Sequence, residues 1–228
     1  MIDSIQTFGD SFMYGSDLAD CDGTAQSQFS QLTWPALCAK ELGLNYNCYG
    51  VGAAGNKSIS LAIIENASST SLNIINWSWI DRFEYIENTS NKSWFRSILP
   101  TSTDDISKFY YKHLNSELDD KITSLVYIYS AHSYLKTNSI PFIATYMDPL
   151  IFDINWHSPP EVIKLQDIIN DDFTSFPNNQ TFLEWSRSNG YPESKGWHPL
   201  KQAHREAAKI WLPIYKEAIN TYITNLED

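Results

Sequence analysis

The chain has 228 residues, of which 43% are hydrophobic and 19% are charged, and its formal net charge is −11. This length and balance predict one folded domain over residues 1–228 rather than a disordered chain. The acidic charge argues against nucleic acid and an anionic membrane as partners, because both require a basic footprint. No run approaches the ~20 apolar residues of a membrane span. The first residues also lack a basic region followed by an apolar segment, so the expected location is cytoplasmic.

The first third of the chain alternates between strand-like and helix-like patterns. In chain order it predicts a strand over residues 2–8, a polar loop over 14–30, a helix from Trp34 to Gly43, a strand over 44–49, a glycine-rich turn over 50–56 and a helix from Lys57 onward. Pro35 suits a first helical turn, and Gly43 suits a helix end.

The remaining two thirds continue the alternation. The pattern predicts, in order, a strand over 71–77, an irregular polar segment to about 103, one long helix from there to about 137, a strand over 141–147, short helices over 162–169 and 181–188, and a final helix over 200–225. Pro213 is expected to kink that last helix or to end its first half.

Strands separated by helical crossovers predict an α/β fold with a mainly parallel sheet and helices on both faces. Functional sites in such sheets form outside the carboxyl ends of the strands. Ser11, the turn over residues 50–56 and the pair Trp77-Ser78 each follow a predicted strand. We therefore expect these three segments to meet at one edge of the sheet.

Three short motifs occur in a defined order along the chain. Gly9-Asp10-Ser11 ends the first strand, Gly52 to Ser58 contains Gly-x-x-Gly after the second, and Gly196-Trp197-His198-Pro199 precedes the last helix. In this order and at these positions the chain resembles the SGNH, or GDSL, hydrolases. The resemblance implies a flavodoxin-like three-layer α/β/α sandwich. It also implies a serine nucleophile, Ser11, and a base, His198.

The resemblance further implies an oxyanion hole that holds the negative oxygen of a tetrahedral intermediate. Its expected donors are the backbone N–H groups of Ser11 and Gly55 and one side chain, either Ser78 or Asn76. The family's third motif, Gly-x-Asn-Asp, is absent, and the choice between Ser78 and Asn76 stays open.

A second departure concerns the acid that orients the histidine. The family places it three residues before the histidine, where this chain has Lys195. Glu193, a backbone carbonyl or a more distant Asp could substitute, and a Ser-His dyad is the minimal interpretation.

The implied activity is hydrolysis of an ester, such as an acetyl or short acyl group on a carbohydrate, through an acyl-enzyme. Asp10, Arg82, Trp77 and Trp197 are candidate substrate-binding residues. No cofactor is expected, and the histidines lack ligand-like spacing, so no metal site is expected either. The alternatives are a non-catalytic glycan- or protein-binding member of the same fold and an acyltransferase. The sequence leaves the oligomeric state open.

Overall fold

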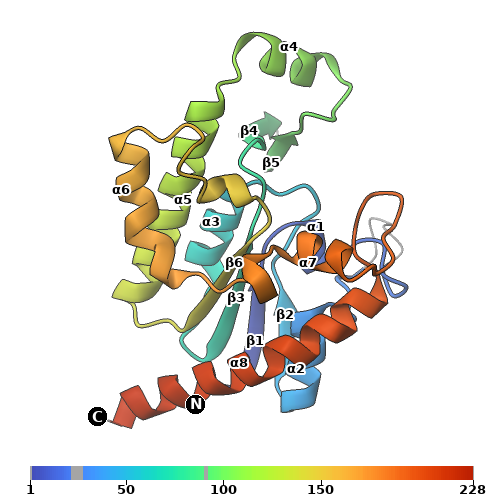
Figure 1. Ribbon diagram of the computed structural model, residues 1–228, viewed down its shortest axis with the longest axis vertical. Helices are drawn as coiled ribbons and strands as arrows, with labels where there is room; N and C mark the ends of the chain where they lie inside the picture. The colour runs from blue at the N-terminus through green and yellow to red at the C-terminus, as the bar shows by residue number, and fades with distance from the viewer. Residues whose placement is uncertain (1, 22–27, 90–91, 228) are drawn as a thin grey trace.

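The computed structural model describes residues 2–21, 28–89 and 92–227. At its centre lies a parallel sheet of four strands in the order β2-β1-β3-β6 (Figure 1). These strands are β1 (Ser4–Phe8), β2 (Asn45–Cys48), β3 (Ser71–Trp77) and β6 (Phe142–Tyr146). The first strand pairs with both β2 and β3, with Ser4 opposite Asn45 and Ser71. The predicted α/β class with a parallel sheet is confirmed.

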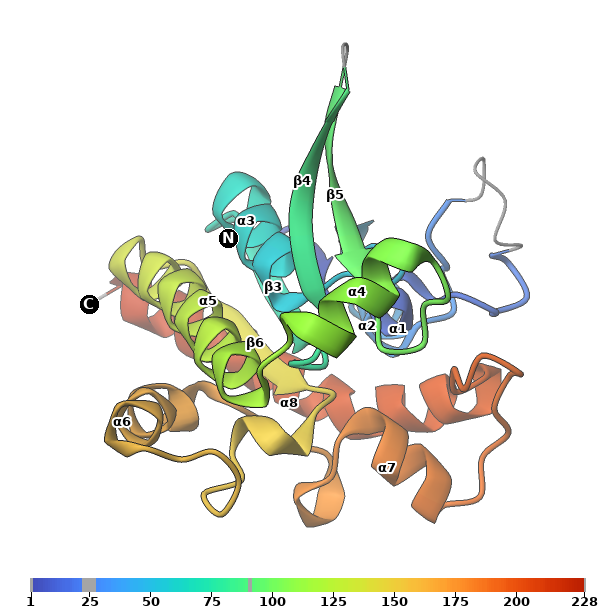
Figure 2. The same cartoon turned by 90° about the horizontal axis from the view of Figure 1, so that it is seen from above.

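Helices cover both faces of the sheet (Figure 2). One face packs against α2 (Trp34–Leu42) and α8 (Lys201–Glu227), and the other against α3 (Asn56–Asn66) and α5 (Glu117–Thr137), with α6 (Pro160–Ile169) outside α5. Successive residues of a strand point to opposite faces. Accordingly Ile74 belongs to the first apolar layer and Ile75 to the second, and both are fully buried. The chain is therefore a three-layer sandwich.

A flavodoxin-like sheet has a fifth strand at its edge. In the described residues a single parallel bridge next to β6 takes that place. Phe173 pairs with Ala144 of β6, and the Thr174 N–H donates to the Ala144 carbonyl at 2.8 Å. The chain then turns through η3 (Pro177–Asn179) into α7 (Phe182–Ser188). The short helices η1 (Pro149–Ile151) and η2 (Asn170–Asp172) complete this part of the molecule.

The segment after β3 is not irregular, as the sequence pattern had suggested. It forms an antiparallel hairpin of β4 (Phe83–Thr89) and β5 (Lys92–Ile98), which projects from the body (Figure 2). Apolar residues face one another across it, for example Ile86 opposite Phe95. Frequent polar residues dilute this alternation, so its period of two is hard to recognise from the sequence.

One helix prediction was wrong in detail. The long helix expected between 103 and 137 is divided into α4 (Asp105–His113) and α5, because Ser116 caps a new helix by accepting from the Asp119 N–H. The last helix continues through Pro213, which excludes one of the two outcomes expected there, an end to its first half.

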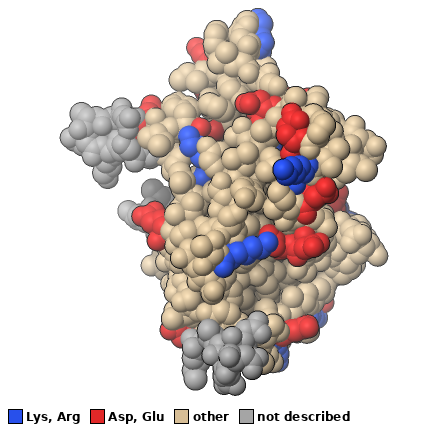
Figure 3. Space-filling view, turned by 90° about the vertical axis from the view of Figure 1, so that its left-hand side faces the viewer, with Lys and Arg blue, Asp and Glu red and all other residues tan. Residues whose placement is uncertain are grey.

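Acidic and basic side chains are interspersed on the face shown in Figure 3, where some red and blue groups lie side by side on a mostly tan surface. Within the described ranges, no helix combines the length and the apolar character that crossing a bilayer requires.

Candidate active site

The turn after β1 presents Ser11 at the carboxyl edge of the sheet. Asp10 caps the single-turn helix α1 (Ser11–Tyr14) by accepting the Phe12 N–H at 3.0 Å. Gly9 has a φ of 159°, and a Cβ there would lie 2.5 Å from Met13 Cγ and 2.9 Å from the Asn76 carbonyl oxygen. Only glycine fits so close to neighbouring atoms. Ser11 is consequently held at a sharp strand-to-helix turn.

His198 reaches Ser11 from the far end of the chain. Its Nε2 lies 2.9 Å from Ser11 Oγ, and its Nδ1 lies 2.7 Å from Oδ2 of Asp17. The Ser194 hydroxyl donates to the same Asp17 oxygen at 2.6 Å. The His198 ring also packs edge-on against Phe12, with 5.3 Å between the ring centres. Serine, imidazole and carboxylate therefore form one hydrogen-bonded row.

Asp17 is a more distant Asp, one of the alternatives that the sequence left open for the residue beside His198. It lies just after α1 with a left-handed φ of 67°. The Ser194 hydrogen bond, followed by the His198 contact, lowers the pKa of Asp17, so that it is charged at neutral pH. A charged acceptor at Nδ1 favours the tautomer that carries its proton there.

Glu193, the residue predicted to orient His198, does not contact it. Its carboxylate binds the guanidinium of Arg187, with Oε1 2.9 Å from Nε and Oε2 3.1 Å from Nη2. Of the alternatives left open by the sequence, the structure thus brings a more distant Asp, Asp17, against His198 and turns Glu193 to Arg187.

The predicted oxyanion donors are mostly occupied by other partners. The Gly55 N–H donates to Glu84 Oε1 at 2.9 Å. The Ser78 hydroxyl donates to Asp10 Oδ2 at 3.1 Å, and Ser78 is fully buried. Of the predicted donors, only the Ser11 N–H belongs to a residue that lines the cleft and also has no acceptor among the described residues.

Asn76 is the last of these predicted donors. It is fully buried, and its Oδ1 accepts the Thr145 hydroxyl at 2.7 Å. Its Nδ2 has no partner among the described residues, but it lies inside the sheet and not at the cleft. Gly55, Ser78 and Asn76 are therefore corrected as oxyanion donors.

The four candidate substrate-binding residues divide into two pairs. Trp77 is fully buried and donates through Nε1 to His132 Nε2 at 3.1 Å, and Asp10 is fully buried beneath Ser11. Neither can touch a substrate, so these two predictions are corrected. Arg82 and Trp197 do line the cleft, and Trp197 is 65% exposed with a left-handed φ of 64°.

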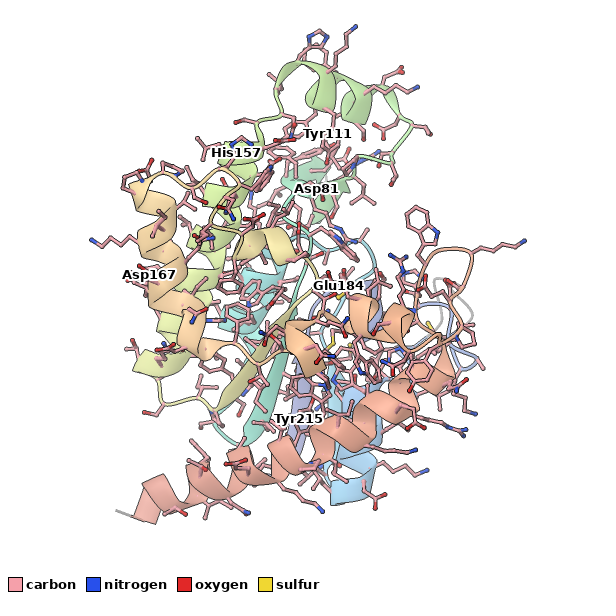
Figure 4. All side chains as sticks on the ribbon, in the orientation of Figure 1. Asp81, Tyr111, His157, Asp167, Glu184 and Tyr215 are labelled. Carbon is pink, nitrogen blue, oxygen red and sulfur yellow. The ribbon has the colours of Figure 1, made fainter. Side chains whose placement is uncertain are left out.

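Ser11 and His198 open into a cleft of about 640 Å³. Four parts of the chain form its walls. They are the turn that carries Ser11, the glycine-rich turn at Gly52-Ala53, the segment Trp79 to Arg82 with the base of the hairpin at Leu99 to Thr101, and α7 with the loop to His198. Figure 4 shows Asp81 at the base of the hairpin close to Tyr111, whose hydroxyl donates to the Asp81 carbonyl. Burial, and next the charge of Asp148, raises the pKa of Asp81.

A second cavity of about 330 Å³ lies beside the hairpin and shares Arg82 with the cleft, but it contains neither Ser11 nor His198. Within the described part of the chain, no group of His, Cys, Asp and Glu side chains is arranged to hold a metal ion. The first cleft is therefore the candidate active site.

Sequence reasoning did not identify Asp17 by its position. Asp17 stands in an acidic loop with Asp20, directly after α1, but nothing in its spacing relates it to a histidine 181 residues away. Trp79 stacks against the Arg82 guanidinium, whose central carbon lies 4.7 Å from the ring centre.

Comparisons with known proteins place this fold. Searches found no matching family model and no matching curated protein. Among solved structures, an acetyl xylan esterase from Butyrivibrio proteoclasticus has a TM-score of 0.51 at 14% identity, covering 96% of this chain and 65% of its own. The chain thus spans just under two thirds of that esterase.

Two shorter proteins are similar over nearly their whole length. A G-D-S-L family protein from Desulfitobacterium hafniense has a TM-score of 0.50 at 12% identity, covering 93% of this chain and 99% of its own. A psychrotrophic esterase from Pseudoalteromonas sp. has a TM-score of 0.52 at 9% identity, covering 96% and 99%. The chain therefore has the SGNH/GDSL hydrolase fold, as its motifs predicted.

Proposed function

We propose that this protein is a serine esterase of the SGNH type, in which Ser11, His198 and Asp17 act as nucleophile, base and orienting acid. The observation that carries the proposal is the continuous row of hydrogen bonds from Ser11 Oγ through both ring nitrogens of His198 to Asp17. This is the arrangement that activates a serine hydroxyl, whose own nucleophilicity is low.

The reaction proceeds through an acyl-enzyme. Ser11 Oγ attacks the ester carbonyl carbon while its proton passes to His198 Nε2, and the C=O electron pair moves to oxygen. The pair then returns, the bond to the alcohol breaks, and His198 gives its proton to the leaving oxygen. Water repeats the sequence on the acyl-enzyme and restores Ser11. Asp17 stays charged and stabilises the imidazolium.

The substrate that the cleft best suits is a short-chain ester of a carbohydrate. Trp79 and Trp197 offer flat apolar faces at the cleft, which are suited to sugar rings. A volume of about 640 Å³ accommodates a sugar unit with a small acyl group. The acetyl xylan esterase with the same fold supports this choice.

The test is covalent labelling with a fluorophosphonate probe. Wild type should be labelled stoichiometrically, Ser11→Ala not at all, and His198→Ala far more slowly, with hydrolysis of p-nitrophenyl acetate lost in parallel. Circular dichroism of each variant checks that the fold is retained. A folded wild type that neither reacts with the probe nor hydrolyses esters would contradict the proposal and favour a binding function. Transfer of the acyl group to an added sugar in place of water would identify a transferase.

A further inference from the structure

The proposed reaction creates a negative oxygen that this cleft must stabilise. In acyl transfer, hydrogen-bond donors aimed at that oxygen provide a large part of the rate enhancement. Gly55 and Ser78 donate to other partners and Asn76 lies inside the sheet, which leaves the Ser11 N–H and the backbone at Gly52 and Ala53 as neutral backbone donors at the cleft. A side chain at the cleft can add a further donor, and a charged one adds the most.

Arg82 is a charged side chain at the cleft with donors to spare. Its Nη1 donates to Asp10 Oδ2 at 3.1 Å and to the Ala54 carbonyl at 2.9 Å. These two bonds use both Nη1 hydrogens, whereas a guanidinium carries five N–H groups. The three on Nε and Nη2 have no acceptor within the described ranges of the chain. Arg82 lines the cleft together with Ser11 and His198.

The guanidinium is also fixed in place. Asp10 is fully buried and directly precedes Ser11, so the ion pair anchors Arg82 to the turn that carries the nucleophile. The Trp79 ring covers the guanidinium at 4.7 Å, and the Arg82 side chain is only 12% exposed. A charge with so little water around it interacts more strongly than one in bulk solvent, and it needs no reorganisation when charge develops nearby.

We propose that Arg82 is a catalytic residue that donates from its free N–H groups to the ester carbonyl oxygen as it becomes an oxyanion. This proposal rests on the esterase function proposed above. When the bond between Ser11 Oγ and the carbonyl carbon forms, the C=O electron pair moves to oxygen opposite the guanidinium. Arg82 neither gains nor loses a proton, and it releases the oxygen when the pair returns and the alcohol leaves.

The experiment measures kcat and KM separately for Arg82→Lys and Arg82→Ala. With neutral p-nitrophenyl acetate, kcat should fall about 10²–10³-fold in Arg82→Ala while KM changes little, because the lost interaction exists only in the transition state. Arg82→Lys should also lose kcat, since an ammonium lacks the planar fork by which a guanidinium binds Asp10 and the oxyanion through separate nitrogens. Millimolar guanidinium ion should restore part of the rate of Arg82→Ala, a response that a purely structural role would not give.

Arg96→Gln is the matched control. It removes an arginine that pairs with Glu87 on the hairpin, outside the cleft, and it should leave both constants unchanged. If Arg82→Ala fails to fold by circular dichroism, Arg82→Lys, which keeps a cation beside Asp10, decides the question.

Three results would overturn the proposal. One is a folded Arg82 variant with unchanged kcat on the neutral ester. Another is a defect confined to KM for an anionic ester such as mono-p-nitrophenyl succinate, which would make Arg82 a binding site for an acidic substrate group. The last is an inactive wild type that the fluorophosphonate probe does not label, in which case the esterase function fails as well.

Discussion

At the scale of single residues, Ser11 and His198 were predictable because each stands in a local motif at a strand or helix boundary. Asp17 was not, because its relation to His198 exists only after the loop following α1 folds against the loop before α8. The same holds for Gly55: its motif is present, but Glu84 on a hairpin strand takes its N–H. A motif therefore indicates where a residue lies, but it does not reveal which group accepts or donates the hydrogen bonds of that residue.

The position of Asp17 leads to a prediction for Asp17→Asn. An amide at this place can no longer hold His198 in the required tautomer or stabilise the imidazolium. For a buried acid this loss costs on the order of 10⁴-fold in kcat. The Asp17 side chain is 45% exposed. Because water partly substitutes for it, we expect a loss of about 10²–10⁴-fold, measured with p-nitrophenyl acetate.

Glu193→Gln is the matched control for this prediction, because it removes a nearby carboxylate that pairs with Arg187. It should retain the wild-type rate. The opposite pattern, with Glu193→Gln impaired and Asp17→Asn unaffected, would restore Glu193 as the orienting acid.

At the scale of elements, the hairpin was missed and yet it supports the active-site edge. Helix α3 begins at Asn56, and Gly55, the residue that precedes it, has no side chain to cap the helix. Glu84 of β4 supplies one: its carboxylate accepts the Ser58 N–H at 2.8 Å and the Ser97 hydroxyl at 3.1 Å, besides the Gly55 N–H. A negative charge at a helix N-terminus is favourable. No local sequence pattern could show this cap, because the two partners lie on separate elements.

The cap leads to a prediction for Glu84→Gln. The glutamine amide has the same shape but no charge, and only one of its two terminal atoms can accept a hydrogen bond. The donors on Gly55, Ser58 and Ser97 therefore lose a strong acceptor. We expect the free energy of unfolding, measured by urea denaturation, to fall by about 1–3 kcal/mol. Glu87→Gln on the exposed side of the same strand should change it by less than about 0.5 kcal/mol. Equal effects of the two substitutions would argue against the cap.

At the scale of the whole molecule, the sheet topology followed from the alternation of strands and helices, because parallel strands need crossovers and those crossovers cover both faces. The fold is kept at 9–14% identity to the solved structures described above. Such divergence leaves the layer pattern and the Ser11 and His198 positions recognisable. Contacts between distant loops and layers, such as the one between α2 and α8, have no local sequence pattern that would predict them.

That contact is made by His204 of α8. The Trp34 N–H, at the start of α2, donates to His204 Nδ1 at 3.2 Å, and the rings of the two residues stack. Burial lowers the pKa of His204 from 6.5 to about 3. The folded protein therefore keeps this imidazole neutral at pH values where the unfolded chain is already protonated.

The pH dependence of stability follows from this difference. Because the unfolded state binds the extra proton between pH 6.5 and about 3, the contribution of His204 to stability is complete above pH 6.5 and declines as the pH falls. At pH 4.5 the loss should be about 2–3 kcal/mol. His132, whose pKa burial also lowers, acts in the same direction. Asp120 acts in the opposite one, because burial raises its pKa to about 6.

His204→Asn isolates the His204 contribution from these others. An asparagine oxygen can still accept the Trp34 N–H but does not titrate, so the variant will be less stable at pH 7 and yet lose less stability on going to pH 4.5. Urea denaturation at both pH values gives, for wild type and for the variant, the loss in free energy of unfolding between pH 7 and pH 4.5. His113→Asn, on the exposed side of α4, should keep the wild-type pH dependence. If His204→Asn lost as much stability between the two pH values as wild type does, the buried neutral imidazole would not be the cause.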